Sequence, residues 1–150
     1  MIKEEIILGK VNDINAFLDD IDMTYFPLTA ADRASDFKGY LFKEDYLEWY
    51  KAIYNGNFVA LVCLRHDNYK CENSTHLSLI EIKSSFRGKY IGTEVMDEIK
   101  ALVTSKGRSL TLSPMDIYDT NRPLTEKFYI KTLGFTEVVD GDVRYLKYSA

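Results

Sequence analysis

The chain has 150 residues, which is the length of one domain and too short for two full-sized ones. Hydrophobic residues make up 46% of it and charged residues 28%, and the few prolines and glycines argue against a disordered or collagen-like chain. No apolar run approaches the roughly 18 residues of a membrane-spanning helix, and the first residues do not resemble a signal peptide. We therefore expect a cytoplasmic protein of residues 1–150, folded as a single domain, without a membrane partner.

The titratable residues exclude some kinds of site. Two cysteines, Cys63 and Cys71, and two histidines, His66 and His76, lack the spacing of a zinc site, so no metal is expected. The net charge of −4 disfavours nucleic acid as a partner. The acids are concentrated early, since residues 1–56 carry 11 acids and 6 bases. Either solvated helix faces explain this imbalance, or the two halves face ligands of opposite sign.

The first part of the chain predicts a short strand followed by helices. A strand is expected over 5–8 and a helix over 11–22, because apolar residues recur there every three or four positions. Residues 24–43 are ambiguous, since Pro27 and Gly39 interrupt any pattern. Residues 44–54 predict a second helix that ends at the following Asn-Gly pair.

The rest of the chain alternates strands with helices. The expected elements, in order, are a strand over 58–64, a polar turn over 67–74, a strand over 76–82, a helix over 91–106, a strand over 109–113, a helix over 123–132, and a hairpin of strands over 135–139 and 143–148. This order predicts a mixed α/β (α+β) domain of three layers, with a twisted mixed sheet of about six to seven strands flanked by about four helices.

One stretch, residues 79–93, combines features of an anion site. A predicted strand ends there, a loop with Gly88 turns the chain, and an amphipathic helix begins near Gly92. A helix N-terminus presents unpaired backbone N–H groups, and glycine lets an anion approach them closely. Arg87 and Lys89 add positive charge. The stretch predicts a phosphate or pyrophosphate cradle, or else an ordinary strand-to-helix turn; it is neither a P-loop nor a Gly-x-Gly-x-x-Gly fingerprint.

Two motifs resemble those of a known family. Residues 87–92, Arg-Gly-Lys-Tyr-Ile-Gly, resemble the Arg/Gln-x-x-Gly-x-Gly/Ala loop of the GNAT superfamily of N-acetyltransferases. Residues 121–135, Asn-Arg-Pro-Leu-Thr-Glu-Lys-Phe-Tyr-Ile-Lys-Thr-Leu-Gly-Phe, resemble its second motif, a helix that ends in Tyr, then Lys, then Gly-Phe. The motifs stand in the family's order. Two positions depart from it: Tyr90 replaces the first signature glycine, and Tyr129 precedes Gly134 by five residues instead of four.

The resemblance implies a fold and a co-substrate. It implies a GNAT-like three-layer domain whose sheet is splayed near its middle and binds acetyl-CoA in the splay. The residues that it assigns to acetyl-CoA come from the central strand, the loop and two helices: Ile80, Ile82, Arg87, Gly88, Lys89, Tyr90, Ile91, Gly92, Thr93 and Asn121.

Acetyl transfer to an amine needs a group that removes the amine proton and a group that protonates the leaving sulfur. The resemblance assigns Tyr129 as the acid, since a phenol with a pKa near 10 suits a thiolate of similar basicity. His76 and Glu81 on the central strand are the candidate bases, and strand alternation places them on opposite faces unless a bulge intervenes. Structural roles are the alternatives: a buried aromatic for Tyr129, a satisfied histidine for His76, and positioning of the acceptor or solvent exposure for Glu81.

We therefore expect an acetyl-CoA-dependent N-acetyltransferase that acts on a primary amine of a small molecule or of a protein. The amine attacks directly, because Cys63 lies inside a predicted strand with no adjacent histidine. The acceptor, often a cation in solution, would be attracted by the acidic half, and a homodimer remains open. Two alternatives stay open as well: an inactive GNAT-fold binding or regulatory module, and another α/β domain whose loop binds a different phosphate ligand.

Overall fold

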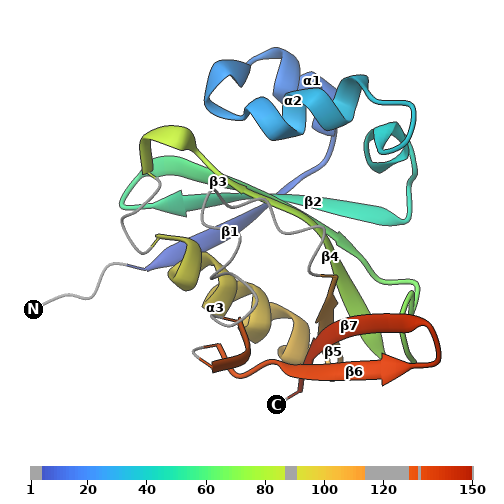
Figure 1. The fold of residues 1–150 in the computed structure, drawn as a ribbon. Helices are drawn as coiled ribbons and strands as arrows, with labels where there is room; N and C mark the ends of the chain where they lie inside the picture. Colours follow the sequence, from blue (N-terminus) through green and yellow to red (C-terminus); the bar gives the residue numbers. More distant parts are fainter. Residues whose placement is uncertain (1–4, 87–90, 114–128, 132, 150) are drawn as a thin grey trace, which may run out of the picture.

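The computed structural model describes residues 5–86, 91–113, 129–131 and 133–149. Its seven strands form one sheet in the order β1-β2-β3-β4-β5-β7-β6 (Figure 1). All neighbours are antiparallel except β4 and β5, which are parallel. The strands are β1 (Ile6–Val11), β2 (Leu47–Tyr54), β3 (Asn57–Arg65), β4 (Ser74–Ile82), β5 (Ser109–Leu112), β6 (Thr136–Asp140) and β7 (Val143–Tyr148).

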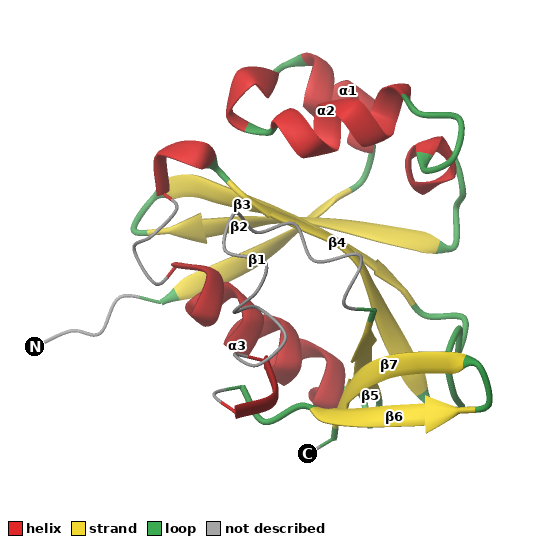
Figure 2. Ribbon diagram, in the orientation of Figure 1, coloured by secondary structure: helices red, strands yellow, loops and turns green. Residues whose placement is uncertain are grey.

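Helices cover both faces of the sheet, which confirms the predicted three layers (Figure 2). Two short helices, α1 (Ile14–Asp19) and α2 (Pro27–Ala34), lie on one face with the 3-10 turns η1 (Met23–Tyr25) and η2 (Gly39–Phe42). The longer α3 (Ile91–Ser105) lies on the other face, and residues 129–131 are also helical. A third 3-10 turn, η3 (Ser84–Phe86), follows β4. Each face has its own apolar core, and burial of these side chains is the main stabilising term.

The prediction of a helix over 44–54 is wrong, because these residues form β2. The strand pairs with β1 along one edge and with β3 along the other, and its two faces pack in different apolar cores. Trp49 packs in the core beneath α1, whereas Tyr50 packs in the core beneath α3. A strand that is apolar on both faces loses its alternation and can imitate a helical spacing. Asn55 and Gly56, both at positive φ, form the tight turn of the β2–β3 hairpin and do not end a helix.

Other boundaries changed less. The predicted helix over 11–22 is shorter, since Val11 ends β1 and Asp13 caps α1 by accepting from the Ala16 N–H at 3.1 Å. The ambiguous residues 24–43 form η1, α2 and η2. The strands predicted on both sides of the Asp-Gly-Asp sequence form the β6–β7 hairpin, in which Asp140 pairs with Val143. In the described part of the chain, no helix is long and apolar enough to cross a membrane.

Candidate active site

The sheet splits between its only parallel neighbours among the described strands, β4 and β5. Their pairing runs from Ser74 opposite Ser109 to Leu77 opposite Leu112 and stops there, although β4 continues for five more residues. At the same level, the register with β3 shifts, since Cys63 pairs with Leu79 and Leu64 pairs with Leu77. Ser78 is therefore the extra residue of a β-bulge. The bulge and the end of the β4–β5 pairing coincide, which opens the sheet at its centre.

The bulge changes which β4 side chains share a face. Leu77 packs in the core beneath α3, but Leu79 packs in the core beneath α1 and α2. Simple alternation would place Leu77 and Leu79 on one face, so the bulge at Ser78 reverses the alternation. Ile80 faces α3 together with Leu77. The backbone of β4 beyond the bulge therefore lies along the split, between two differently packed faces.

Part of the expected acetyl-CoA site is assembled at the far end of β4. Ile80 and Ile91 pack in one core, and Ile82 packs against it. A Cβ atom on Gly92 would lie 3.8 Å from the Ile82 side chain, which is an ordinary contact. The first turn of α3, which includes Thr93, thus begins beside the end of β4. The other predicted contacts lie outside the described residues: Arg87, Gly88, Lys89, Tyr90 and Asn121.

Tyr129, the candidate acid, is buried in the same core as Ile80 and Ile91. Its ring meets Phe135 edge-on at 5.5 Å between centroids. Its carbonyl accepts from the Phe135 N–H at 3.0 Å, and Gly134 between them has φ +79°. The usual closing bond of such a helix end joins residues five apart, whereas this one joins residues six apart. The bond that closes this helix end therefore spans one residue more than usual, as does the spacing from Tyr129 to Gly134.

His76, one candidate base, lies on the opposite face of the sheet from Leu77 and is buried. Its Nδ1 is 2.9 Å from the hydroxyl oxygen of Thr111, the residue opposite it on β5. The ring also meets Tyr69 edge-on at 5.0 Å between centroids. Since Thr111 fixes the ring at the closed end of the split, His76 is held where β4 and β5 begin to separate.

Glu81, the other candidate base, is fully buried, which excludes solvent exposure, one of the two alternatives to catalysis. Its carboxylate accepts from the backbone N–H of Thr29 at 2.7 Å, from the Thr29 hydroxyl at 2.7 Å and from the Leu28 N–H at 3.1 Å. These donors belong to the first turn of α2, where a carboxylate satisfies unpaired N–H groups and the helix dipole. Glu81 lies five positions after His76, or about 16 Å along a strand. The two candidate bases are therefore not parts of one constellation.

Sequence analysis missed a charged and aromatic cluster beside His76. The Arg65 guanidinium donates to both carboxylate oxygens of Asp67, at 3.0 and 2.7 Å. Its Cζ lies 3.9 Å from the Tyr69 ring centroid and 5.2 Å from that of Tyr46. The guanidinium holds the pKa of Asp67 below its usual range, with a smaller contribution from His76. The only sequence signal for this cluster was that Arg65 and Asp67 lie two positions apart at the start of a polar turn.

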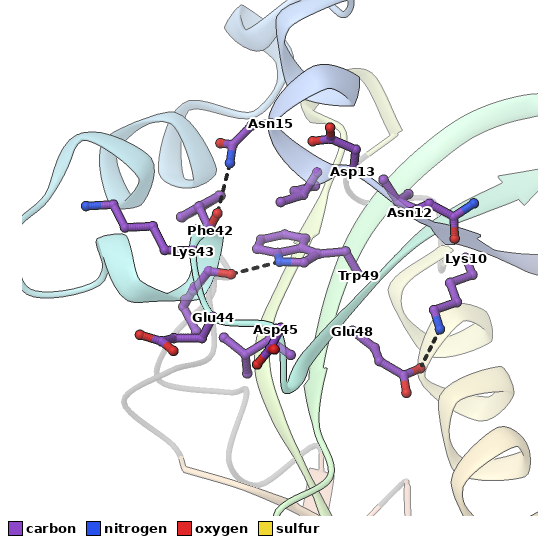
Figure 3. Close-up of a pocket in the computed structure, with 14 residues that line it drawn as sticks. Lys10, Asn12, Asp13, Asn15, Phe42, Lys43, Glu44, Asp45, Glu48 and Trp49 are labelled. Atoms are coloured by element: carbon purple, nitrogen blue, oxygen red, sulfur yellow. Dashed lines mark hydrogen bonds and ion pairs between the residues drawn. The ribbon is translucent and has the colours of Figure 1, made fainter.

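A separate pocket of about 460 Å³ opens where β1 ends and β2 begins (Figure 3). Trp49 lines it, and its indole N–H donates to the Leu41 carbonyl at 2.9 Å. Asn15 donates to the Phe42 carbonyl at 2.8 Å and so ties α1 to η2. Acids outnumber bases in the lining, where the charged residues are Asp13, Glu44, Asp45, Glu48, Lys10 and Lys43. The pocket is built by the N-terminal region and lies two strands away from β4.

Two other kinds of chemistry lack support in this region. Cys63 is fully buried in β3, and burial raises the pKa of its thiol, so the thiolate needed for an acyl-enzyme is disfavoured. Among the described residues, no three His, Cys, Asp or Glu side chains are grouped to hold a metal ion.

The chain resembles known acetyltransferases in sequence and in fold. The sequence model of the acetyltransferase (GNAT) family matches residues 14–135. No curated protein matches the chain. Similar solved structures include PaiA N-acetyltransferase from Thermoplasma acidophilum in complex with coenzyme A, at 15% identity and a TM-score of 0.59, over 97% of this chain and 99% of that one.

Two further structures have comparable similarity. A GNAT family acetyltransferase from Elizabethkingia anophelis with acetyl-CoA bound has 14% identity and a TM-score of 0.62, over 99% of this chain and 100% of that one. The KacTA–DNA complex has 18% identity and a TM-score of 0.62, over 96% of this chain and 92% of that one. At such identities the structures show the shared fold, and the family model covers most of the sequence. The chain belongs to the GNAT acetyltransferase family.

Proposed function

We propose that this chain transfers an acetyl group from acetyl-CoA to a primary amine. The proposal rests on the split between β4 and β5, where pairing stops at Leu77 beside the bulge at Ser78. Beyond that point, the described residues include no further pairing between β4 and β5, so the edges of the two strands diverge. A strand edge of this kind can hydrogen-bond an extended amide chain, which is the chemistry of the pantetheine arm. Coenzyme A or acetyl-CoA in two similar structures supports this assignment.

The residues at the end of β4 fit the anionic part of acetyl-CoA. The first turn of α3 begins beside Ile82, and a 15-residue helix presents free N–H groups and a positive dipole end there. Gly92 has no side chain to fill the space next to Ile82, where a Cβ would lie 3.8 Å from the Ile82 side chain. Arg87 and Lys89 precede the helix in sequence and would add positive charge.

Acetyl-CoA, when bound, supplies an activated acyl carbon and a thiolate leaving group. As the amine nitrogen bonds to that carbon, the C–S bond breaks and the nitrogen loses a proton. In our proposal an imidazole nitrogen of His76 accepts this proton, directly or through water, since Thr111 orients the ring. The Tyr129 hydroxyl protonates the sulfur. Glu81 positions α2 against β4 and is not the base, because its oxygens already accept three hydrogen bonds.

Calorimetric titration with acetyl-CoA tests the cradle. Gly92→Asp places a carboxylate at the start of α3, where it opposes the pyrophosphate, and we expect binding to weaken at least about 100-fold, because like charges repel across a short distance. Gly92→Asn is the matched control, since it has the same size without the charge. Position 92 is helical and a Cβ there meets only ordinary contacts, so both variants should fold.

The two variants separate the outcomes. Equal acetyl-CoA binding by Gly92→Asp and Gly92→Asn would show that the pyrophosphate does not bind at this position. Micromolar binding by the parent chain, without acetylation of any primary amine, would favour the inactive binding module instead.

A further inference from the structure

The cluster beside His76 is placed by the registers of three strands. Leu47 on β2 pairs with Arg65 on β3, and Arg65 pairs with His76 on β4. Tyr46 immediately precedes β2, and Asp67 and Tyr69 follow β3. The row thus crosses the sheet at the level where β4 and β5 begin to separate. The row therefore lies beside His76, whose ring meets Tyr69 edge-on.

Arg65 organises the aromatic side chains of this row. Its guanidinium lies against the Tyr69 ring at 3.9 Å and near the Tyr46 ring at 5.2 Å. The two bonds to Asp67 fix the guanidinium and neutralise its charge. A cation over a ring face, held by a bidentate carboxylate, restricts both rings. Tyr46 and Tyr69 are therefore preorganised and not merely exposed.

Three tyrosines around Arg65 keep a large apolar area in contact with solvent. Tyr40, Tyr46 and Tyr69 are 39%, 40% and 48% exposed. The Tyr40 hydroxyl lies within electrostatic reach of Arg65, as does that of Tyr46. Grouped exposed aromatics of this size mark binding surfaces in soluble proteins, and tyrosine loses little entropy when it binds. We call Tyr40, Tyr46 and Tyr69 the aromatic rim.

We propose that the aromatic rim binds the acceptor, and that the acceptor is a primary amine with an aromatic or similarly flat apolar body. This inference rests on the proposed acetyl transfer. The flat body packs on the rim, and His76, in edge contact with Tyr69, is the neighbouring group that can take the proton. A small hydrophilic amine would leave the rim in contact with water, so it would gain no binding free energy from burial of these rings.

A comparison of two amines on matched variants tests the proposal. We expect the parent chain to acetylate phenethylamine with a kcat/KM at least about tenfold above that for butylamine. Tyr69→Ala and Tyr46→Ala should each lower this ratio several-fold, mainly through KM. Tyr69→Phe, which keeps the ring, should preserve it. The control is Tyr25→Ala, because Tyr25 is 38% exposed and lies against Lys83, at the other end of β4 from His76.

The outcomes distinguish this inference from the proposed function. Two results would exclude acceptor binding by the aromatic rim while leaving acetyl transfer intact. One is equal kcat/KM for the two amines, and the other is a ratio of these kcat/KM values that is unchanged in both alanine variants. If neither amine is acetylated, acetyl transfer to such amines fails, and calorimetric titration of phenethylamine in the presence of coenzyme A still decides on the rim. Saturable binding that Tyr69→Ala weakens and Tyr25→Ala does not would support the rim; its absence would exclude it.

Discussion

Tyr129, the proposed acid, also has a structural role. Its ring is buried against Phe135 in the core beneath α3, which is the structural alternative expected for it. That same core includes Ile80 on the edge of the split. The sequence motif singled out Tyr129. It could not predict the bond from the Phe135 N–H to the Tyr129 carbonyl, which closes a longer turn around Gly134.

Removal of the Tyr129 hydroxyl tests the acid role. Tyr129→Phe keeps the buried ring, so we expect little change in the free energy of unfolding and in acetyl-CoA affinity. The kcat should fall about 100-fold, because a positioned general acid contributes at least that much. The measurements are steady-state kinetics, calorimetry and urea unfolding on one preparation.

Tyr50→Phe is the matched control for this variant. The Tyr50 hydroxyl donates to Glu48 at 2.6 Å, and burial together with this carboxylate raises its pKa. Its loss should cost about 1.5–3 kcal/mol of stability, as for a bond to a charged group, and leave kcat unchanged. If the two variants lower kcat equally, the Tyr129 hydroxyl is not the acid.

At the scale of elements, β4 connects the two faces of the molecule. Its Ile80 side packs against α3, and its Glu81 side holds the first turn of α2. The strand and the helix after it were predictable from their apolar runs, and so was the β6–β7 turn, whereas β2 was predicted as a helix. The bulge at Ser78 was not, because it depends on the pairing with β3 and β5. Nor was the burial of Glu81, since its partner Thr29 is 52 residues away.

Variants of Glu81 test whether its carboxylate stabilises the first turn of α2. Glu81→Ala leaves backbone donors of α2 without an acceptor, at about 1–3 kcal/mol for each buried donor. Glu81→Gln keeps one carbonyl oxygen for Thr29 and should recover part of this loss. Thr29→Val removes only the hydroxyl bond and should cost about 1 kcal/mol. Urea unfolding should rank the variants in this order.

Kinetics then separate positioning from catalysis at Glu81. If Glu81 only positions α2, the acceptor KM should rise as the stability falls. Glu81→Gln should then restore much of the stability and of the original KM. A catalytic base predicts the opposite pattern, in which Glu81→Gln is stable but nearly inactive.

Over the whole molecule, the acids are concentrated in residues 1–56, which carry 11 acids and 6 bases. The pocket at the start of β2 carries Glu44 and Asp45, for which the described residues provide no ion-pair partner. Other acids of this region are engaged, since Asp19 pairs with Arg33 at 2.9 Å and Asp22 caps η1. The Glu44 and Asp45 carboxylates thus lie near the start of β2, two strand spacings or about 10 Å from the level of His76.

These carboxylates should attract a cationic acceptor over that distance. The combined variant Glu44→Gln with Asp45→Asn is expected to raise the acceptor KM about two- to fivefold at low ionic strength, with kcat unchanged, because the charges act before the chemical step. The difference should shrink above 0.1 M salt, where the Debye length falls to about 10 Å. Asp142→Asn, on the exposed β6–β7 turn, is the control of like charge and should leave KM unchanged at every salt concentration. A KM that does not respond to the double variant at low salt would show that Glu44 and Asp45 do not guide the acceptor.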